Sequence, residues 1–160
     1  MILANTLSIS GLLTPERICV GLDAGTKQDA INEVVDLLSS SPEVRDVEQL
    51  RADVFTREQV MSTGVGKGLA LPHAQSAAVS NTLVAFAVTK NLVDYNALDG
   101  VPVRLILLLV GPENERAIHV RLLGRISRLM NDPSFRALLI DADDEDAIVD
   151  IITKAEEVHG

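Results

Sequence analysis

The sequence predicts an α/β fold in three layers, a three-layer α/β/α sandwich with a mixed central β-sheet and helices on both faces. Two segments, residues 82–89 and 103–110, are apolar at successive positions instead of alternating, as in strands that are buried on both faces. Segments with apolar residues at helical spacing lie on either side of them along the chain. Strands buried in this way need helices over each face. At 160 residues the chain is long enough to bury one core, so we predict a single domain over residues 1–160.

The first predicted elements are a strand over residues 19–22 and two helices. Thr26 is placed to cap the first helix, which the Ser-Ser-Ser-Pro run at residues 39–42 ends. Asp46 followed by Gln49 resembles a capping box that opens the second helix. The apolar positions that recur at helical spacing are Ile31, Val34, Val35 and Leu38 in the first helix and Val47, Leu50 and Val54 in the second.

Three further helices are predicted after Pro112. The first has an apolar stripe within residues 118–130, and the spacing places His119 on that face. Pro133 starts a short helix, and apolar residues within 148–155 form the stripe of the last one. The opposite face of the first of these helices is predicted to be solvated, and it carries Arg121, Arg125 and Arg128.

The composition excludes several classes of function. A formal net charge of −9 repels a phosphate backbone, and with 2% aromatic residues the chain lacks stacking surfaces for bases, so we expect no nucleic-acid binding. Residues 1–10 lack the basic region and apolar core of a signal peptide, and the apolar run at residues 105–110 is too short to span a bilayer. We therefore expect a cytoplasmic protein. Cys19 lies in the apolar run ICVGL, so we expect its thiol to be buried.

The segment REQVMSTGVGKGLALPHA, residues 57–74, carries the most specific pattern in the chain. Glycines at alternate positions, Gly64, Gly66 and Gly68, free the backbone to turn its N–H groups toward an anion. Pro72 fixes its own φ angle and favours an extended conformation before it. We therefore predict that GLALPH is a short strand that stops at His73, which is then exposed and held in place.

A neutral imidazole in this position suits phosphoryl chemistry. Because the reference pKa of a free imidazole is about 6.5, a ring of this kind keeps one nitrogen free as an acceptor at cytoplasmic pH. The loop N–H groups, the hydroxyls of Ser62 and Thr63, and Arg57 are the donors available to stabilise charge on a phosphoryl group. Such a site needs no metal and no cofactor. The alternatives are a turn histidine with no chemistry and a metal-dependent hydrolase that uses His73 and His119, although no HExxH motif supports the latter.

Residues 57–74 resemble the signature of phosphotransferase-system enzyme IIA domains of the fructose and mannitol type (type 2), which include nitrogen-regulatory relatives. The match to the pattern STG-x-G-x-G-x-A-x-PH extends to the Arg-Glu pair at residues 57 and 58, and the layout of almost the whole chain is similar. Met61 departs from the pattern, because relatives often have a small residue there. The resemblance implies that His73 accepts a phosphoryl group and that Arg57 lies at the active site. Ser62, Thr63, Gly64 and Gly66 are predicted to bind the phosphoryl group, because they supply the hydroxyl and N–H donors of the loop.

The resemblance also bears on residues that composition leaves open. His119 on an apolar helix face is either a core residue or, as the family's second histidine implies, an assistant that hydrogen-bonds the phosphoryl oxygens or orients His73. Arg57 alone is an ordinary helix-end arginine, and Glu58 is predicted to be structural or on the surface. Lys67 does not belong to a nucleotide-binding loop, because the spacing of GVGKG is wrong for one.

The implied function is that of a phosphotransferase. The chain is expected to accept a phosphoryl group on His73 from a histidine-containing phosphocarrier protein and to pass it to a IIB component, with at most peripheral contact with a membrane permease. The alternative is a nitrogen-regulatory binding module, in which phosphorylation of His73 switches the affinity for regulatory target proteins and no sugar is transported. The sequence contains no permease or IIB segment, which favours the alternative, and neighbouring genes would discriminate between the two.

Overall fold

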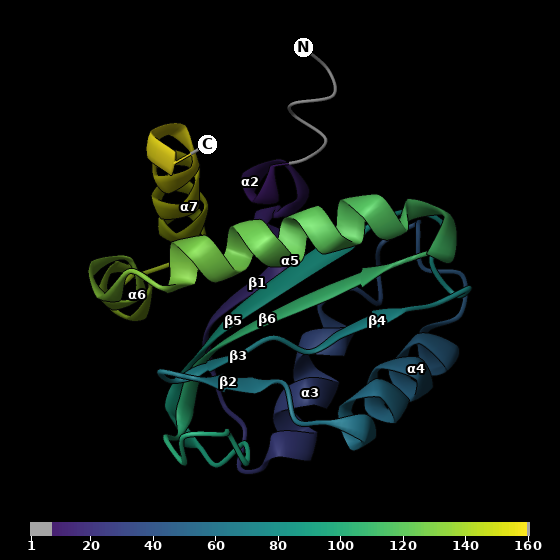
Figure 1. Ribbon diagram of the computed structural model, residues 1–160, viewed down its shortest axis with the longest axis horizontal. Coiled ribbons are helices and arrows are strands. Elements are labelled where there is room, and N and C mark those ends of the chain that lie inside the picture. The colour runs from purple at the N-terminus through teal and green to yellow at the C-terminus, as the bar shows by residue number, and fades with distance from the viewer. Residues whose placement is uncertain (1–7, 160) are drawn as a thin grey trace.

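The computed structural model describes residues 8–159 and confirms the predicted fold, a mixed β-sheet with helices on both faces (Figure 1). The six-stranded sheet has the order β1-β5-β6-β3-β2, and β4 pairs with β6 off this path. The pairs β1–β5, β3–β6 and β4–β6 are parallel, while β5–β6 and β2–β3 are antiparallel. The strands are β1 (Ile18–Leu22), β2 (Gly64–Gly66), β3 (Leu69–Ala70), β4 (His73–Gln75), β5 (Leu83–Val93) and β6 (Val103–Gly111).

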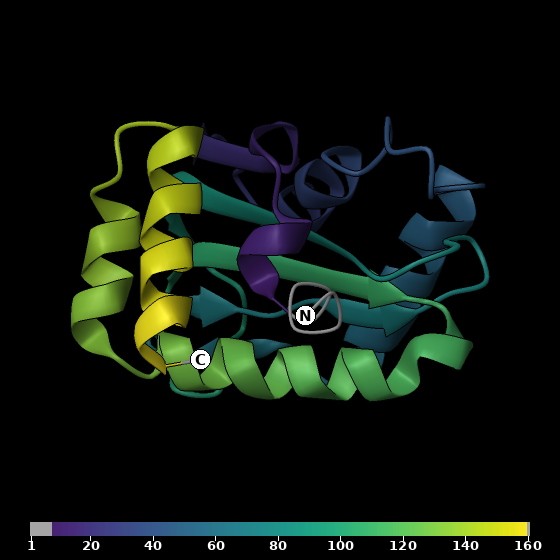
Figure 2. The ribbon, with the colours of Figure 1, turned by 90° about the horizontal axis from the view of Figure 1, so that it is seen from above.

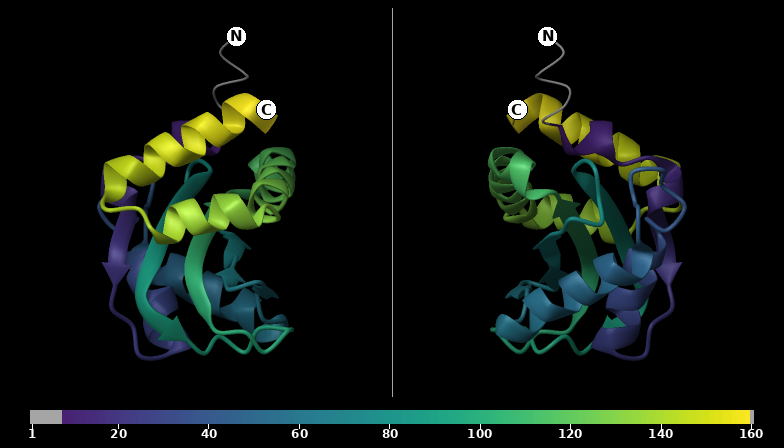
Figure 3. Two further views of the ribbon diagram at one scale, coloured as in Figure 1. Left: turned by 90° about the vertical axis from the view of Figure 1, so that its left-hand side faces the viewer. Right: turned by 90° about the vertical axis from the view of Figure 1, so that its right-hand side faces the viewer.

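Two helical layers enclose the sheet, as Figure 3 shows edge-on. One layer consists of α3 (Lys27–Asp36) and α4 (Val47–Val60). The other contains α2 (Ile9–Leu12), α5 (Arg116–Met130), α6 (Pro133–Ile140) and α7 (Glu145–His159). Seen from above, α5 lies along the strands and α7 lies across them (Figure 2). Short 3-10 turns, η1 (Pro15–Arg17) and η2 (Glu113–Glu115), precede β1 and α5.

The predicted caps start the helices of the first layer. The Thr26 hydroxyl accepts a hydrogen bond from the Asp29 N–H at 3.1 Å, and the Asp46 carboxylate accepts one from the Gln49 N–H at 3.1 Å. Such bonds satisfy N–H groups that have no partner within the helix, and replacing a cap of this kind by alanine typically costs about 1 kcal/mol. The Gln49 side chain donates to Asp53 one turn further on, at 2.8 Å.

The central strands β5 and β6 are buried on both faces, as their continuous apolar runs predicted. On one face Ala85, Ala87, Ile106 and Leu108 pack with residues of α3 and α4. On the other, Phe86, Leu105, Leu107 and Leu109 pack with residues of α5, α6 and α7. Full burial of one Leu, Ile or Phe side chain contributes roughly 1.5–3 kcal/mol, so these two strands hold both layers in place.

The predicted strand over GLALPH is wrong in detail. The strand β3 covers only Leu69–Ala70, and His73 begins the separate strand β4 instead of ending the first one. Pro72 lies between the two strands, and because it has no N–H it cannot donate to the ladder. Its carbonyl still accepts from the Leu109 N–H at 3.1 Å, which sets the register of His73 opposite Leu109.

Two further expectations need correction. Arg125 does not belong to a fully solvated face, because it lies 3.4 Å from the buried carboxylate of Glu156, which also accepts from the backbone N–H groups of Ile9 and Ser10. Arg121 and Arg128 are exposed as expected. Cys19 is only half-buried, and burial raises the pKa of its thiol.

Within residues 8–159, no helix is both long enough and apolar enough to cross a membrane. Residues 1–7, on which most of the signal-peptide prediction depends, lie outside the described part of the chain.

Candidate active site at the sheet edge

His73 lies on an edge strand, where the two helical layers meet. In the segment that leads to β4, Leu71 packs in the α5 layer, whereas Ala74 packs in the α3–α4 layer. Successive residues of a strand point to opposite faces, so His73 and Gln75 point toward the α5 layer. Because β4 pairs with β6 and stands off the main path of the sheet, side chains from both layers can reach His73.

The hydrogen bonds of the His73 ring define which nitrogen is free. The ring Nδ1 lies 2.7 Å from the Leu71 carbonyl oxygen. A carbonyl oxygen only accepts, so Nδ1 carries the proton and donates, and the lone pair is on Nε2. This nitrogen lies 3.4 Å from the Nη2 atom of Arg57. The protein therefore fixes both the tautomer and the orientation of a partly exposed imidazole.

Arg57 comes from the last turn of α4 and brings a permanent positive charge to the Nε2 side of the His73 ring. Its Nη1 atom is buried and has no hydrogen-bond partner among the described residues. The guanidinium therefore has donor capacity left for an anion between itself and the histidine.

His119 comes from the first turn of α5, on the opposite side of His73. Its ring centroid lies 5.8 Å from that of His73, with an angle of 54° between the planes, and the residue is 6% exposed. Burial above all, and then the charges of His73 and Arg116, lower the pKa of His119 to about 4. The ring is therefore neutral at physiological pH, and its buried Nδ1 atom has no hydrogen-bond partner among the described residues.

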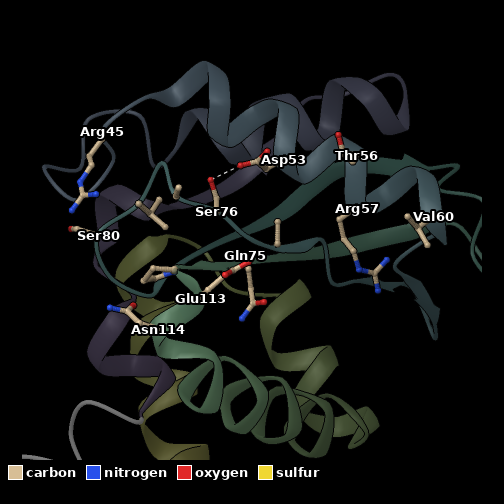
Figure 4. Close-up of a pocket in the computed structure, with 14 residues that line it drawn as sticks. Arg45, Asp53, Thr56, Arg57, Val60, Gln75, Ser76, Ser80, Glu113 and Asn114 are labelled. Atoms are coloured by element: carbon tan, nitrogen blue, oxygen red, sulfur yellow. Dashed lines mark hydrogen bonds between the residues drawn. The ribbon is translucent and has the colours of Figure 1, made fainter.

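An open pocket of about 760 Å³ lies beside this edge, between α4, β4 and the turn η2. Arg57 and Gln75 both contribute to its wall (Figure 4). Further along it the Ser76 hydroxyl donates to Asp53 at 2.6 Å, and Arg45 stands at the far end. The pocket therefore adjoins the candidate site through Arg57 and Gln75.

The loop before His73 is held by a buried polar network. Glu58 is 6% exposed, and its carboxylate accepts from the Thr63 N–H at 2.8 Å and from the Thr63 hydroxyl at 2.5 Å. The Lys27 ammonium lies 2.8 Å from the same carboxylate and 4.7 Å from the centre of the Tyr95 ring. Burial above all, and then Glu58, raise the pKa of Tyr95. Glu58 is therefore structural, and we call these four residues, Lys27, Glu58, Thr63 and Tyr95, the loop anchor.

The side chains predicted to bind the phosphoryl group make hydrogen bonds that hold the loop itself. The Ser62 hydroxyl donates to the Tyr95 carbonyl at 3.2 Å and accepts from the Gly64 N–H at 3.2 Å. Thr63 is only 3% exposed, and its hydroxyl already donates to Glu58 within the loop anchor. The prediction that this hydroxyl is available to a phosphoryl group is therefore corrected. Gly66 adopts φ = 100°, in the region that favours glycine. Contact of Ser62, Gly64 and Gly66 with a phosphoryl group stays a prediction.

The structure brings together three of the predicted site residues, His73, Arg57 and His119, from three separate elements. Sequence reasoning missed Lys27 and Tyr95, which lie far from the signature along the chain and show no motif of their own. Across residues 8–159, no three His, Cys, Asp or Glu side chains form a group that could hold a metal ion.

Comparison with known proteins places this site in context. The model of the family described as "Phosphoenolpyruvate-dependent sugar phosphotransferase system, EIIA 2" matches residues 11–155. A fructose-specific EIIABC component of Bacillus subtilis is 35% identical over 92% of this chain, which spans only 23% of that relative. A fructose-specific EIIA component of Haloferax volcanii is 30% identical, with 96% of this chain and 99% of the relative covered. The crystal structure of the nitrogen regulatory protein IIA-Ntr from Neisseria meningitidis superimposes with a TM-score of 0.83 at 30% identity, over 90% of this chain and 98% of that one.

Proposed function

Because the chain belongs to the EIIA 2 family of the phosphoenolpyruvate-dependent sugar phosphotransferase system, we propose that it is a phosphotransferase component that carries a phosphoryl group on Nε2 of His73. The observation that carries this proposal is the 2.7 Å hydrogen bond between the His73 Nδ1 and the Leu71 carbonyl. It leaves Nε2 as the nucleophile of the ring. We also propose that residues 1–160 form one domain.

The transfer step exchanges one N–P bond for another. The lone pair of His73 Nε2 attacks the phosphorus of a phosphohistidine on the donor protein, and the electron pair of the broken N–P bond returns to the donor's imidazole. Positive charge develops on the His73 ring as the new bond forms, and the Leu71 carbonyl stabilises it through the Nδ1–H. Both imidazoles keep their other N–H, so no proton has to move, and the step is reversible.

Arg57 and His119 supply donors for the oxygens of the phosphoryl group. Phosphoryl transfer asks the protein mainly to position the group and to stabilise the charge on its equatorial oxygens. Arg57 reaches the Nε2 side from α4 with a charged, planar donor set. His119 is neutral, so it can donate a hydrogen bond without adding a second positive charge beside His73.

We infer the partners from the family to which the chain belongs. The donor is a histidine-containing phosphocarrier protein, charged from phosphoenolpyruvate by enzyme I, and the recipient is a IIB component. The fructose-specific relative from Bacillus subtilis supports this recipient, because its name combines EIIA with EIIB and EIIC. We place the reaction in the cytoplasm, where phosphoenolpyruvate is produced.

A second candidate is regulation. The fit to the IIA-Ntr structure favours a module whose phosphorylation state switches binding to regulatory proteins, without delivery to a sugar. The two candidates share the phosphorylation of His73 and differ in the next step. Incubation of the phosphorylated protein with a IIB domain separates them, because only the transport role requires the phosphoryl group to leave for the IIB component.

Phosphorylation of His73 is tested with phosphoenolpyruvate, enzyme I and the phosphocarrier protein. We expect one acid-labile phosphoryl group per chain, and none in a folded His73→Ala variant. Labelling that persists in His73→Ala would place the acceptor elsewhere. A wild-type chain that cognate donors leave unlabelled would contradict the proposal as a whole.

A further inference from the structure

Hydrogen-bond capacity is left over around His73. Among the described residues, four buried side-chain nitrogen or oxygen atoms have no hydrogen-bond partner, and one of them, the Thr14 hydroxyl, lies at the N-terminal cap position of η1. The other three are nitrogens: Nη1 of Arg57, Nδ1 of His119 and Nε2 of Gln75. Arg57 and His119 flank His73, and Gln75 follows it by two residues on β4. The concentration of these atoms at one site requires an explanation.

Gln75 is the residue of this group to which the sequence pattern assigned no role. It stands opposite Gly111 of β6, just as His73 stands opposite Leu109, so the strand pairing fixes its position relative to the histidine. The two side chains share one face of β4, because residues two apart in a strand point the same way. Gln75 also lines the pocket that Arg57 lines (Figure 4).

An unpartnered amide nitrogen inside a protein is costly. A buried donor without an acceptor costs about 1–3 kcal/mol, and glutamine also loses side-chain entropy when it is held in place. No acceptor among the described residues offsets this cost at Gln75. A group that brings acceptor oxygens into the site would offset it, and a phosphoryl group on His73 brings three.

We propose that Gln75 is a further catalytic residue, whose side-chain amide donates a hydrogen bond to an oxygen of the phosphoryl group as it moves to and from His73 Nε2. The inference rests on the proposed function. With Arg57, and with His119 in the tautomer that carries its proton on Nδ1, it matches three donor nitrogens to three phosphoryl oxygens. The bonds that form and break are those of the transfer step above, and Gln75 neither gains nor loses a proton.

The test compares Gln75→Met with Gln75→Glu. Methionine keeps the length of the side chain but removes the donor, and glutamate keeps the shape but replaces the donor by a negative charge. We expect kcat for transfer from the phosphocarrier protein to fall about a hundredfold in Gln75→Met, with little change in KM for the donor, as for the loss of one amide donor to a developing oxyanion. Gln75→Glu should be slower still, because its carboxylate repels the phosphoryl oxygens.

The control is Gln59→Met, which makes the same change at an exposed position of α4 and should leave the rate unaltered. Melting temperatures show whether each variant is folded. A folded Gln75→Met protein that transfers within about threefold of the wild-type rate would overturn the proposal. So would a folded Gln75→Glu protein that is as fast as Gln75→Met, because it would show that the amide does not face the phosphoryl group.

Phosphoramidate separates this proposal from the proposed function. It is a small phosphoryl donor that phosphorylates histidine without a partner protein, with ammonia as the leaving group. We expect phosphoramidate to label His73 in the wild type, and to label it more than tenfold more slowly in Gln75→Met. This result would show that Gln75 acts on the phosphoryl group even if the phosphocarrier protein proved not to be a donor. Equal rates with phosphoramidate would overturn the role of Gln75 while leaving phosphorylation of His73 intact.

Discussion

The group around His73 and the loop anchor next to it are both polar and largely enclosed, yet they differ in how their hydrogen bonds are completed. In the loop anchor, the Glu58 carboxylate is bonded by Lys27 and Thr63, with Tyr95 at 3.4 Å. Around His73, Arg57 and His119 each keep a buried nitrogen that has no partner within residues 8–159. A network whose hydrogen bonds are all made stiffens a structure, whereas donors without acceptors can bind a ligand.

The residues of the two groups alternate along the chain, although the groups are separate in space. Arg57 and Glu58 are adjacent residues at the end of α4, and yet one faces the site and the other the loop anchor. Mutations in the two groups should therefore separate activity from stability. The site should lose rate while it keeps its fold, and the loop anchor should lose stability.

The largest effect is expected at Arg57. Arg57→Met removes a charged donor that acts on the transferring group, so the rate should fall roughly a hundred- to thousandfold, or about 2.7–4 kcal/mol. The melting temperature should stay close to that of the wild type, because Nη1 has no partner among the described residues and the 3.4 Å contact of Nη2 is with a partly exposed ring. Labelling kinetics together with calorimetry measure both quantities. A folded Arg57→Met protein with an unchanged rate would remove Arg57 from the site.

The loop anchor should respond in the opposite way. Glu58→Gln leaves the mostly buried Lys27 ammonium without its carboxylate, and the free energy of unfolding should fall by about 3 kcal/mol. Denaturant titration measures this loss, and Lys27→Met with the double variant completes a cycle that isolates the coupling of the pair. We expect the transfer rate per folded molecule to stay within about tenfold of the wild type. Rate loss without loss of stability would show that Glu58 belongs to the site instead.

Acid should destabilise the protein through His119. The unfolded chain binds a proton on this ring below about pH 6.5, while the folded protein, with a pKa of about 4, does not until the pH is far lower. The unfolded state therefore binds more protons between these values, and the free energy of unfolding falls by up to about 3 kcal/mol as the pH drops from 6.5 to 4. His119→Gln should flatten this part of the stability curve. An identical curve for the variant would mean that His119 is not held neutral by the fold.

Among the residues around His73, the smallest effect on rate is expected at His119. Its neutral ring is a weaker donor than a charged one, so His119→Ala should slow transfer about ten- to a hundredfold, or roughly 1.4–2.7 kcal/mol. His119→Gln keeps a donor and similar bulk and should retain more of the rate. If His119→Ala lowers the melting temperature and leaves the rate per folded molecule intact, His119 is a core residue only.

Much of the fold could be predicted from local patterns. The continuous apolar runs of β5 and β6, the caps at Thr26 and Asp46, and the helical stripe of α5 depend on residues close together in the chain, where spacing and side-chain chemistry act directly. The break between β3 and β4 could not be predicted, since it depends on how Pro72 meets Leu109 of a strand that comes later.

By itself, the sequence determined which histidine stands at the end of the signature and that an arginine precedes it at a helix end, because these features lie within one short segment. Only the tertiary structure decided the state of the site. The free nitrogen of His73 follows from its hydrogen bond to a backbone carbonyl, and the neutral ring of His119 follows from burial. The Gln75 amide is buried at the sheet edge, where no described residue gives its nitrogen an acceptor. Hydrogen bonds and desolvation act over a few ångströms in space, and neither can be read from residues that are far apart in the chain.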